Sequence, residues 1–293
     1  MLNLNELLNT APRTPAVTGE WASVYLEPMI GSGERLTIVV AAKCADKLID
    51  VRPAIRQEII DIMYGQRSEA FSSMVDVIAT SLKLHLEKTR SFHTWVPPVS
   101  GVTLGKVRKA ASKDLVGILR QAITLSSSLS SLLDDKSELN STKKQTRTEK
   151  DRWTTQLQQA VIRSDARRQG YFNAKYDFKN KRMAASVFYL SEHAAINTGK
   201  LLPSSLSNLV AHSKAKIADL SLIKSHPDLL PRETHEFIVF KPSDDDPRYQ
   251  DSEIAKVNSA FLILQDLAEK DEITLTAVTD IQEGAMRILR TAA

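Results

Sequence analysis

The chain has a single cysteine, Cys44, among its 293 residues. One thiol cannot close an internal disulfide or supply a cysteine-rich zinc site, so the disulfide-stapled and zinc-ribbon classes are excluded. No apolar run approaches the roughly 18 residues of a membrane-spanning helix, and the first residues lack the basic and apolar regions of a signal peptide. We therefore expect a cytoplasmic protein in which Cys44 is buried as a small apolar residue.

Helix-breaking residues are missing from the middle of the chain. Proline is absent between Val99 and Leu202, and glycine is absent between Ile118 and Gln169. A stretch of this length without either residue is difficult to build from short strands, so it predicts helix.

Apolar residues repeat at heptad positions over 115–132 and return on the same seam over 153–160. Lysines occupy the seam between them, where a dry interface cannot form. Two arrangements fit this pattern: an antiparallel helical hairpin with 112–133 against 149–168, or one continuous helix. The segment between the two helical stretches is rich in Asp, Ser, Asn and Thr, which compete with the helical backbone. The hairpin, a coiled-coil-like arm with a basic tip, is therefore favoured.

Strand and helix patterns lie on both sides of this arm. On the N-terminal side we expect two strands joined by a Gly/Pro loop and then two helices, at 21–26, 35–42, 50–65 and 68–88. The second strand is apolar almost throughout, which predicts cover on both faces. On the C-terminal side we expect a strand pair, a helix, a short strand and two closing helices with a strand between them, at 171–178, 183–190, 203–223, 236–240, 251–269, 279–291 and 273–278.

These patterns predict a helix-rich α+β fold: antiparallel β-hairpins packed with helices, with a central long antiparallel helical hairpin. The predicted organisation is an N-terminal tail, an α+β unit, the helical arm and a C-terminal α+β unit, at 1–19, 20–98, 99–169 and 170–293. The two α+β units could also form one domain.

Charge is distributed unevenly along the chain. Residues 143–182 contain twelve Lys/Arg and four Asp/Glu, whereas residues 214–293 contain ten and fifteen. Cations neutralise phosphates and exposed aromatic rings can stack on bases, so the basic stretch predicts contact with nucleic acid. The candidate residues are Lys143, Lys144, Arg147, Arg163, Arg167, Arg168, Lys175, Lys179, Lys181 and Arg182. A further basic cluster, Lys106, Arg108, Lys109 and Lys113, is expected near the base of the arm.

A structural interpretation competes with the nucleic-acid one, and we favour it. Strict alternation along a strand would place Phe172, Ala174, Tyr176 and Phe178 on one core-facing side. The opposite side, which includes Lys175, would then be an ordinary solvated face.

Enzymatic signals are weak. Asp165, Asp177 and Lys179 have the loose form of a metal-dependent nuclease centre, in which two carboxylates hold Mg²⁺ and a lysine activates water. Acid-x-Lys triplets are common by chance, and Asp165 is expected within a helix. His235 and Glu236 would point to opposite faces of a strand, so we expect no metal site there. No phosphate-binding loop or dinucleotide fingerprint is present, and we expect no cofactor.

Three functional hypotheses follow. The first is a non-catalytic subunit of a cytoplasmic complex that uses its basic arm to contact partner proteins and nucleic acid, without a membrane partner. The second is a metal-dependent nuclease acting through Asp165, Asp177 and Lys179. The third is a structural protein that self-associates through the arm.

Overall fold

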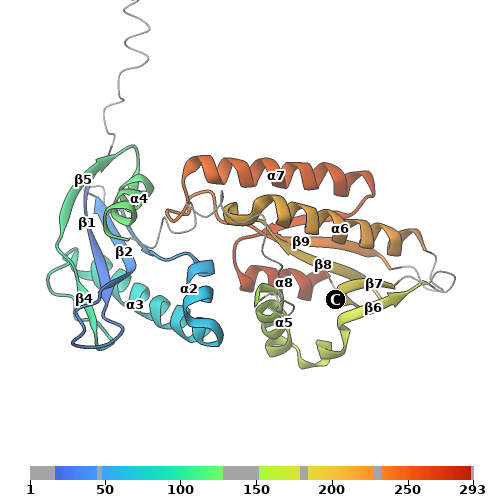
Figure 1. Ribbon diagram of the computed structural model, residues 1–293, viewed down its shortest axis with the longest axis horizontal. Helices are drawn as coiled ribbons and strands as arrows, with labels where there is room; N and C mark the ends of the chain where they lie inside the picture. Colours follow the sequence, from blue (N-terminus) through green and yellow to red (C-terminus); the bar gives the residue numbers. More distant parts are fainter. Residues whose placement is uncertain (1–16, 45–47, 128–151, 179–183, 227–231, 292–293) are drawn as a thin grey trace, which may run out of the picture. The chain divides into compact units, whose positions relative to one another are not determined.

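The computed structural model describes residues 17–44, 48–127, 152–178, 184–226 and 232–291. Its contacts divide the chain into two compact units (Figure 1). Unit 1 comprises residues 1–135 with 245–250, and unit 2 comprises residues 136–244 with 251–293.

Unit 1 is built on an antiparallel sheet. Its first three strands are β1 (Val17–Leu26), β2 (Leu36–Cys44) and β3 (Ile49–Pro53). Two further strands, β4 (Val102–Leu104) and β5 (Arg108–Ser112), pair one after the other with the free edge of β1. The strands expected at 21–26 and 35–42 are confirmed, whereas β4 and β5 were not expected.

Helices cover both faces of this sheet. On one face, α2 (Gln57–Tyr64) and α3 (Ser68–Thr89) pack on a core that contains Val24, Ile38 and Leu82. On the other face, α4 (Leu115–Ser126) packs on Trp21 and Val40. The expectation that the second strand is covered on both sides is therefore confirmed.

We predicted a helix that begins near Asp50, with Pro53 in its first turn. This prediction is wrong. Residues 49–53 form the edge strand β3, which pairs with residues 39–43 of β2. Pro53 ends that strand, at a sheet edge where proline is tolerated. The helix begins at Gln57 instead.

Residues 245–250 are folded into unit 1. Arg56 and Tyr249 are buried, with the Arg56 guanidinium 4.6 Å from the centre of the Tyr249 ring. Arg56 Nε donates to the carbonyl oxygen of Arg248 at 3.0 Å, and the Tyr249 hydroxyl donates to Glu58 Oε1 at 3.3 Å. Buried polar groups require such partners, so these contacts anchor the 245–250 segment.

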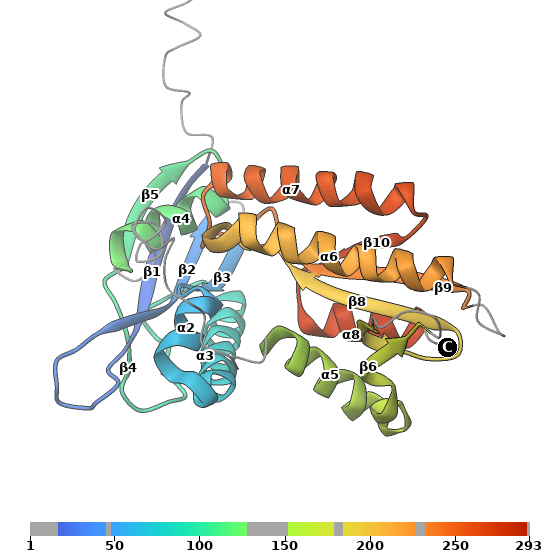
Figure 2. The same ribbon diagram turned by 45° about the vertical axis from the view of Figure 1, so that its right-hand side comes forward.

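Unit 2 contains a mixed five-stranded sheet in the order β10-β9-β8-β7-β6 (Figure 2). Its strands are β6 (Phe172–Asp177), β7 (Ala184–Leu190), β8 (Ala194–Lys200), β9 (Thr234–Phe240) and β10 (Thr274–Val278). The first three form an antiparallel meander, so the expected hairpin of 171–178 with 183–190 is confirmed. The remaining pairs are parallel, so the expectation of antiparallel hairpins alone is wrong for this unit. The unexpected strand β8 reverses the chain and makes parallel crossovers necessary.

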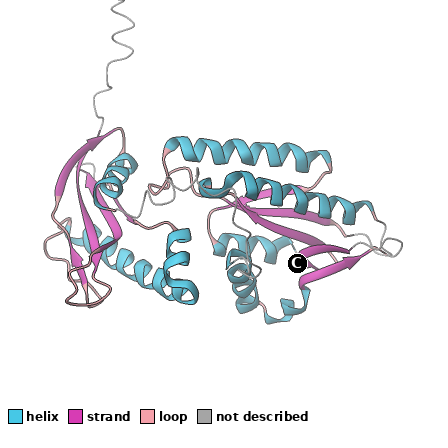
Figure 3. Ribbon diagram, viewed as in Figure 1, coloured by secondary structure: helices cyan, strands magenta, loops and turns pink. Residues whose placement is uncertain are grey.

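Four helices enclose this sheet in two layers (Figure 3). The crossover helices α6 (Leu206–Ser225) and α7 (Asp251–Lys270) cover one face. The helices α5 (Arg152–Ser164) and α8 (Ile281–Thr291) cover the other. Gly284 allows α5 and α8 to approach closely, because a Cβ there would lie 3.0 Å from Leu157 Cδ1.

The sheet of unit 2 forks between β7 and β8. These strands pair only at Tyr189–Ile196 and Leu190–Ala195. Beyond the Tyr189–Ile196 pair, the buried Asn197 side chain replaces a backbone partner, since its Oδ1 accepts from Phe188 N at 2.9 Å. Asn197 Nδ2 also donates to the carbonyl oxygen of Lys216 at 3.2 Å, which ties α6 to the fork.

The helical arm is not confirmed. Its predicted seam residues Ile118 and Ala122 lie in the core of unit 1, whereas Trp153 and Leu157 lie in the core of unit 2. The apolar stripes of α4 and α5 are therefore buried on two different sheets. Residues 128–151, which include the predicted tip, and the predicted tail to residue 16 lie outside the described residues. No helix in the described part of the chain is long and apolar enough to cross a bilayer.

Candidate nucleic-acid interface

Four exposed cations line the outer edge of the unit 1 sheet: Lys106, Arg108, Lys109 and Lys113. We call this set the β5 rim. Two of its members lie on β5, one precedes the strand and one follows it. No acidic residue interrupts the sequence from Gly105 to Lys113. The four cations therefore follow one another along the chain with no acid between them, and Glu20 of β1 lies opposite Lys109 across the sheet.

Strand pairing fixes two of the rim cations on opposite faces of the sheet. The Arg108 guanidinium lies 5.5 Å from the centre of the Trp21 ring, on the face covered by α4. Lys109 is the register partner of Glu20, whose carboxylate lies 3.1 Å from the Lys43 ammonium. Lys43 in turn lies over the Phe92 ring, on the face covered by α3. Adjacent residues of a strand point to opposite faces, as Arg108 and Lys109 do here.

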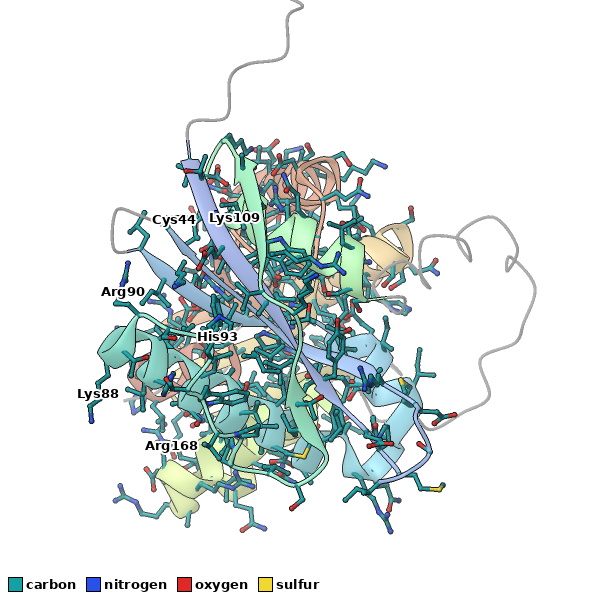
Figure 4. The ribbon with its side chains drawn as sticks, turned by 90° about the vertical axis from the view of Figure 1, so that its left-hand side faces the viewer. Cys44, Lys88, Arg90, His93, Lys109 and Arg168 are labelled. Atoms are coloured by element: carbon teal, nitrogen blue, oxygen red, sulfur yellow. The ribbon has the colours of Figure 1, made fainter. Side chains whose placement is uncertain are left out.

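More cations lie on the α3 face of the sheet. Arg90 ends α3 in the left-handed region, with φ 56°. Its carbonyl oxygen accepts from Lys43 Nζ at 2.6 Å, and its Nη2 donates to the carbonyl oxygen of Cys44 at 3.1 Å. Figure 4 shows Lys88, Arg90, His93 and Lys109 on the side of unit 1 that faces the viewer. These contacts hold Arg90 and Lys43 at the end of α3, where Lys43 is also paired with Glu20.

Four of the ten cations predicted to bind nucleic acid lie among the described residues, all in unit 2. Arg163 and Lys175 are exposed. Arg167 has a side chain that is 91% exposed and forms an ion pair with Asp165. Arg168, labelled in Figure 4, is largely buried and bonds both Asp165 and the Tyr189 hydroxyl. The other six, Lys143, Lys144, Arg147, Lys179, Lys181 and Arg182, lie outside the described residues.

Asp165 organises the described arginines of this stretch. Its carboxylate accepts from the backbone N–H of Arg167 at 3.2 Å and caps a short 3-10 helix (Ala166–Tyr171). Hydrogen bonds from the Arg167 side chain are the main cause that holds the pKa of Asp165 below its usual range, with Arg168 adding to it. One carboxylate therefore serves two guanidinium groups, and Arg168 has a structural role.

The aromatic residues of this stretch mostly face the protein interior. Tyr176 and Phe178 pack toward α6 and α7, as the alternation predicted. The prediction that Phe172 lies on the same side is wrong. Phe172 packs with Phe188 and Tyr189 toward α5 and α8. Asn173, at φ 54°, explains the switch, since a left-handed residue interrupts the regular alternation of a strand.

The exposed side of β6 carries Asn173, Lys175 and Asp177, so the predicted solvated face is confirmed for these residues. Among the described aromatic residues of 171–178, Tyr171 alone is exposed, with 41% of its surface accessible. The structural interpretation therefore accounts for most of the interleaved aromatics.

The candidate nuclease residues are not seen together. Asp165 lies before the start of β6 and Asp177 lies at its end, and a strand of this length spans about 17 Å. Lys179 lies outside the described residues. Within the described ranges, no group of three or more His, Cys, Asp or Glu side chains could hold a metal ion. The geometry adds no support to the nuclease hypothesis.

The expected separation of His235 and Glu236 is present. Glu236 is fully buried and accepts from Arg287 Nε at 2.7 Å and from the hydroxyls of Thr276 and Thr291, on the α8 side. The environment of His235 includes Lys224 of α6, and burial is the main cause that lowers its pKa. Glu236 therefore joins α8 to the sheet and is not paired with His235.

Comparison of the chain with protein-family models, with curated proteins and with solved structures finds no match.

Proposed function

We propose that this chain binds nucleic acid by contacting phosphates through the β5 rim. The observation that supports the proposal best is the line of four exposed cations without an intervening acid. Such a line is the electrostatic pattern by which proteins neutralise a phosphate backbone. Cys44 is buried, as expected, and offers no reactive thiol at this surface.

A purely structural explanation accounts for part of the rim. Charged side chains on an edge strand prevent unwanted pairing with other chains. That reason applies to Arg108 and Lys109, which lie on β5. It does not apply to Lys106 and Lys113, which lie outside the strand. The exposed cations of unit 2, chiefly Arg163 and Lys175, would add a second contact.

The test is binding of a fluorescent duplex of about 20 base pairs, followed by anisotropy over a range of salt concentrations. Four phosphate contacts predict a slope of log K against log salt of about −3.6, at roughly 0.9 per contact. The K106Q/K109Q variant should lower the size of that slope by about 1.8. The control variant K256Q/K270Q removes two exposed lysines from α7, with the same change in net charge, and should leave the slope unchanged.

The outcomes separate the two surfaces. Equal losses in K106Q/K109Q and K256Q/K270Q would mean that only total charge matters and would contradict a specific interface. A loss confined to R163Q/K175Q would move the interface to unit 2. An absence of binding at low salt would remove the proposal altogether.

A wider role as a non-catalytic subunit of a cytoplasmic complex fits a binding surface of this kind. The part of that hypothesis that uses the arm, for a protein partner or for a second copy, rests on residues 128–151. It stays a prediction, which light scattering of the purified protein would check. A dimer that Leu129→Asp dissociates would support self-association, and a monomer at micromolar concentration would contradict it.

A further inference from the structure

We infer that the β5 rim binds the backbone of a double helix and not a single strand. This inference rests on the proposed function and adds the class of nucleic acid. It follows from two features of unit 1: the covering of its aromatic rings and the placement of rim cations on both faces of the sheet.

Proteins that hold single strands combine a cationic groove with exposed aromatic rings, because stacking on each base contributes about 1–3 kcal/mol. No Phe, Tyr or Trp side chain in the described part of unit 1 is exposed, and His93 is an exposed imidazole on the α3 side of the sheet. Of the two rings of β1 that lie nearest the rim, Trp21 is buried and Tyr25 is half-buried. The Arg108 guanidinium lies over Trp21, and the backbone at Gly105 packs on Tyr25, where an added Cβ would lie 2.6 Å from Cε2. The rim therefore offers cations without a stacking platform.

The direction of the cations supports the same conclusion. Arg108 projects from the α4 face of the edge strand and Lys109 from the α3 face. A single phosphate chain can follow only one face of the edge at a time. A double helix presents two phosphate chains on either side of a groove, about 12 Å apart in the major groove of B-form DNA. Cations on both faces of one strand suit that arrangement.

The length of the rim matches a short stretch of duplex. From Lys106 to Lys113 an extended chain spans about 23 Å, and phosphates of a duplex recur every 3.4 Å of helix axis on each strand. The rim would therefore cover about seven base-pair steps. Because a duplex is stiff, with a persistence length of about 150 base pairs, its phosphates do not have to be ordered on binding. The expected binding is independent of sequence, since no rim side chain needs to reach a base edge.

The experiment compares a duplex of about 20 base pairs with one of its own strands, using the full chain at the same series of salt concentrations. The duplex should bind at least tenfold more tightly at moderate salt. Arg108→Gln and Lys109→Gln should each lower the size of the duplex slope by about 0.9, because each contacts one of the two phosphate chains. Arg108→Lys should retain the slope, and it serves as the control for the ring contact with Trp21.

The results distinguish the inference from the proposal on which it rests. If the single strand binds as tightly as the duplex and K106Q/K109Q still weakens it, the proposed function stands and the inference is overturned. If only one of Arg108→Gln and Lys109→Gln changes the slope, one phosphate chain is contacted and the two-chain arrangement is overturned. If neither probe binds, the proposed function fails. Circular dichroism of each variant confirms that the fold is retained.

Discussion

Replacing Glu236 with alanine should destabilise unit 2 strongly. The carboxylate is fully buried on β9 and accepts from Arg287 Nε at 2.7 Å and from Thr291 Oγ1 at 2.8 Å, besides the Thr276 hydroxyl. It therefore joins three elements, β9, β10 and α8. Removing it leaves one guanidinium and two hydroxyls without their acceptor.

The loss in the free energy of unfolding depends on how exposed the partners of Glu236 are. Breaking a buried ion pair costs about 3–5 kcal/mol when the remaining charge stays buried. The Arg287 side chain is 39% exposed, so its guanidinium can turn to water and that part of the cost is reduced. The two hydroxyls add about 1 kcal/mol each. We expect a loss of roughly 3 kcal/mol in the free energy of unfolding, at the low end of the range for buried pairs.

Urea denaturation measures this loss, and hydrogen exchange in peptides of β9 and α8 shows where it occurs. The control is Glu269→Ala, which removes an exposed glutamate from α7 and should cost less than about 0.5 kcal/mol. The double variant E236L/R287M should recover part of the stability, because an apolar pair replaces both charges. A loss below about 1 kcal/mol for Glu236→Ala would refute the reasoning, since an acceptor with three partners cannot contribute so little.

Three other predictions concern single side chains. Asn197→Leu should lower the free energy of unfolding by about 2–4 kcal/mol in the same assay, because the fork loses the acceptor of Phe188 N and the donor to α6; unchanged stability would contradict this role. His235 has a lowered pKa in the folded state, so its contribution to stability is present above its unfolded pKa of about 6.5 and is lost as the pH falls below that value. His235→Phe should flatten the stability of unit 2 between pH 7 and pH 5, and an unchanged slope would exclude the histidine as its source. Tyr249→Phe removes one hydrogen bond to Glu58 and should lower the free energy of unfolding by about 1 kcal/mol. Arg56→Ala should lower it more than twice as much, because it removes both the hydrogen bond to Arg248 and the contact with the Tyr249 ring. Equal losses would show that the ring contact contributes nothing.

Local periodicity predicted the elements whose burial is decided by near neighbours. The apolar run 36–44 predicted a strand covered on both faces, and apolar residues at helical spacing predicted α3, α7 and α8. Charge and proline misled the prediction at Asp50, because an edge strand tolerates proline as readily as the first turn of a helix does. The strand β5 was not predicted because its residues, Arg-Lys-Ala-Ala-Ser, include no large apolar side chain.

The arm shows a more general limit of sequence patterns. The heptad residues Ile118 and Leu157 are buried, as the seam required, but each packs on a different sheet. An apolar stripe at helical spacing specifies that a face will be covered and does not specify by what. Contacts between segments distant in the sequence decide what an apolar helix face packs on, and these contacts cannot be inferred from the pattern of a single sequence.

The candidate interface shows the same limit: the sequence revealed the basic cluster but not its place in the fold. The sequence located the cations 106–113 as a cluster at the base of an arm, whereas the structure places them along the open edge of a sheet. A helix surface would have spread these side chains around its axis, since successive residues turn by about 100°. An edge strand instead divides them between two faces along a single line. Under the proposed function, that division would let the two faces contact two phosphate chains. The separate effects of Arg108 and Lys109 on the salt dependence of binding test this.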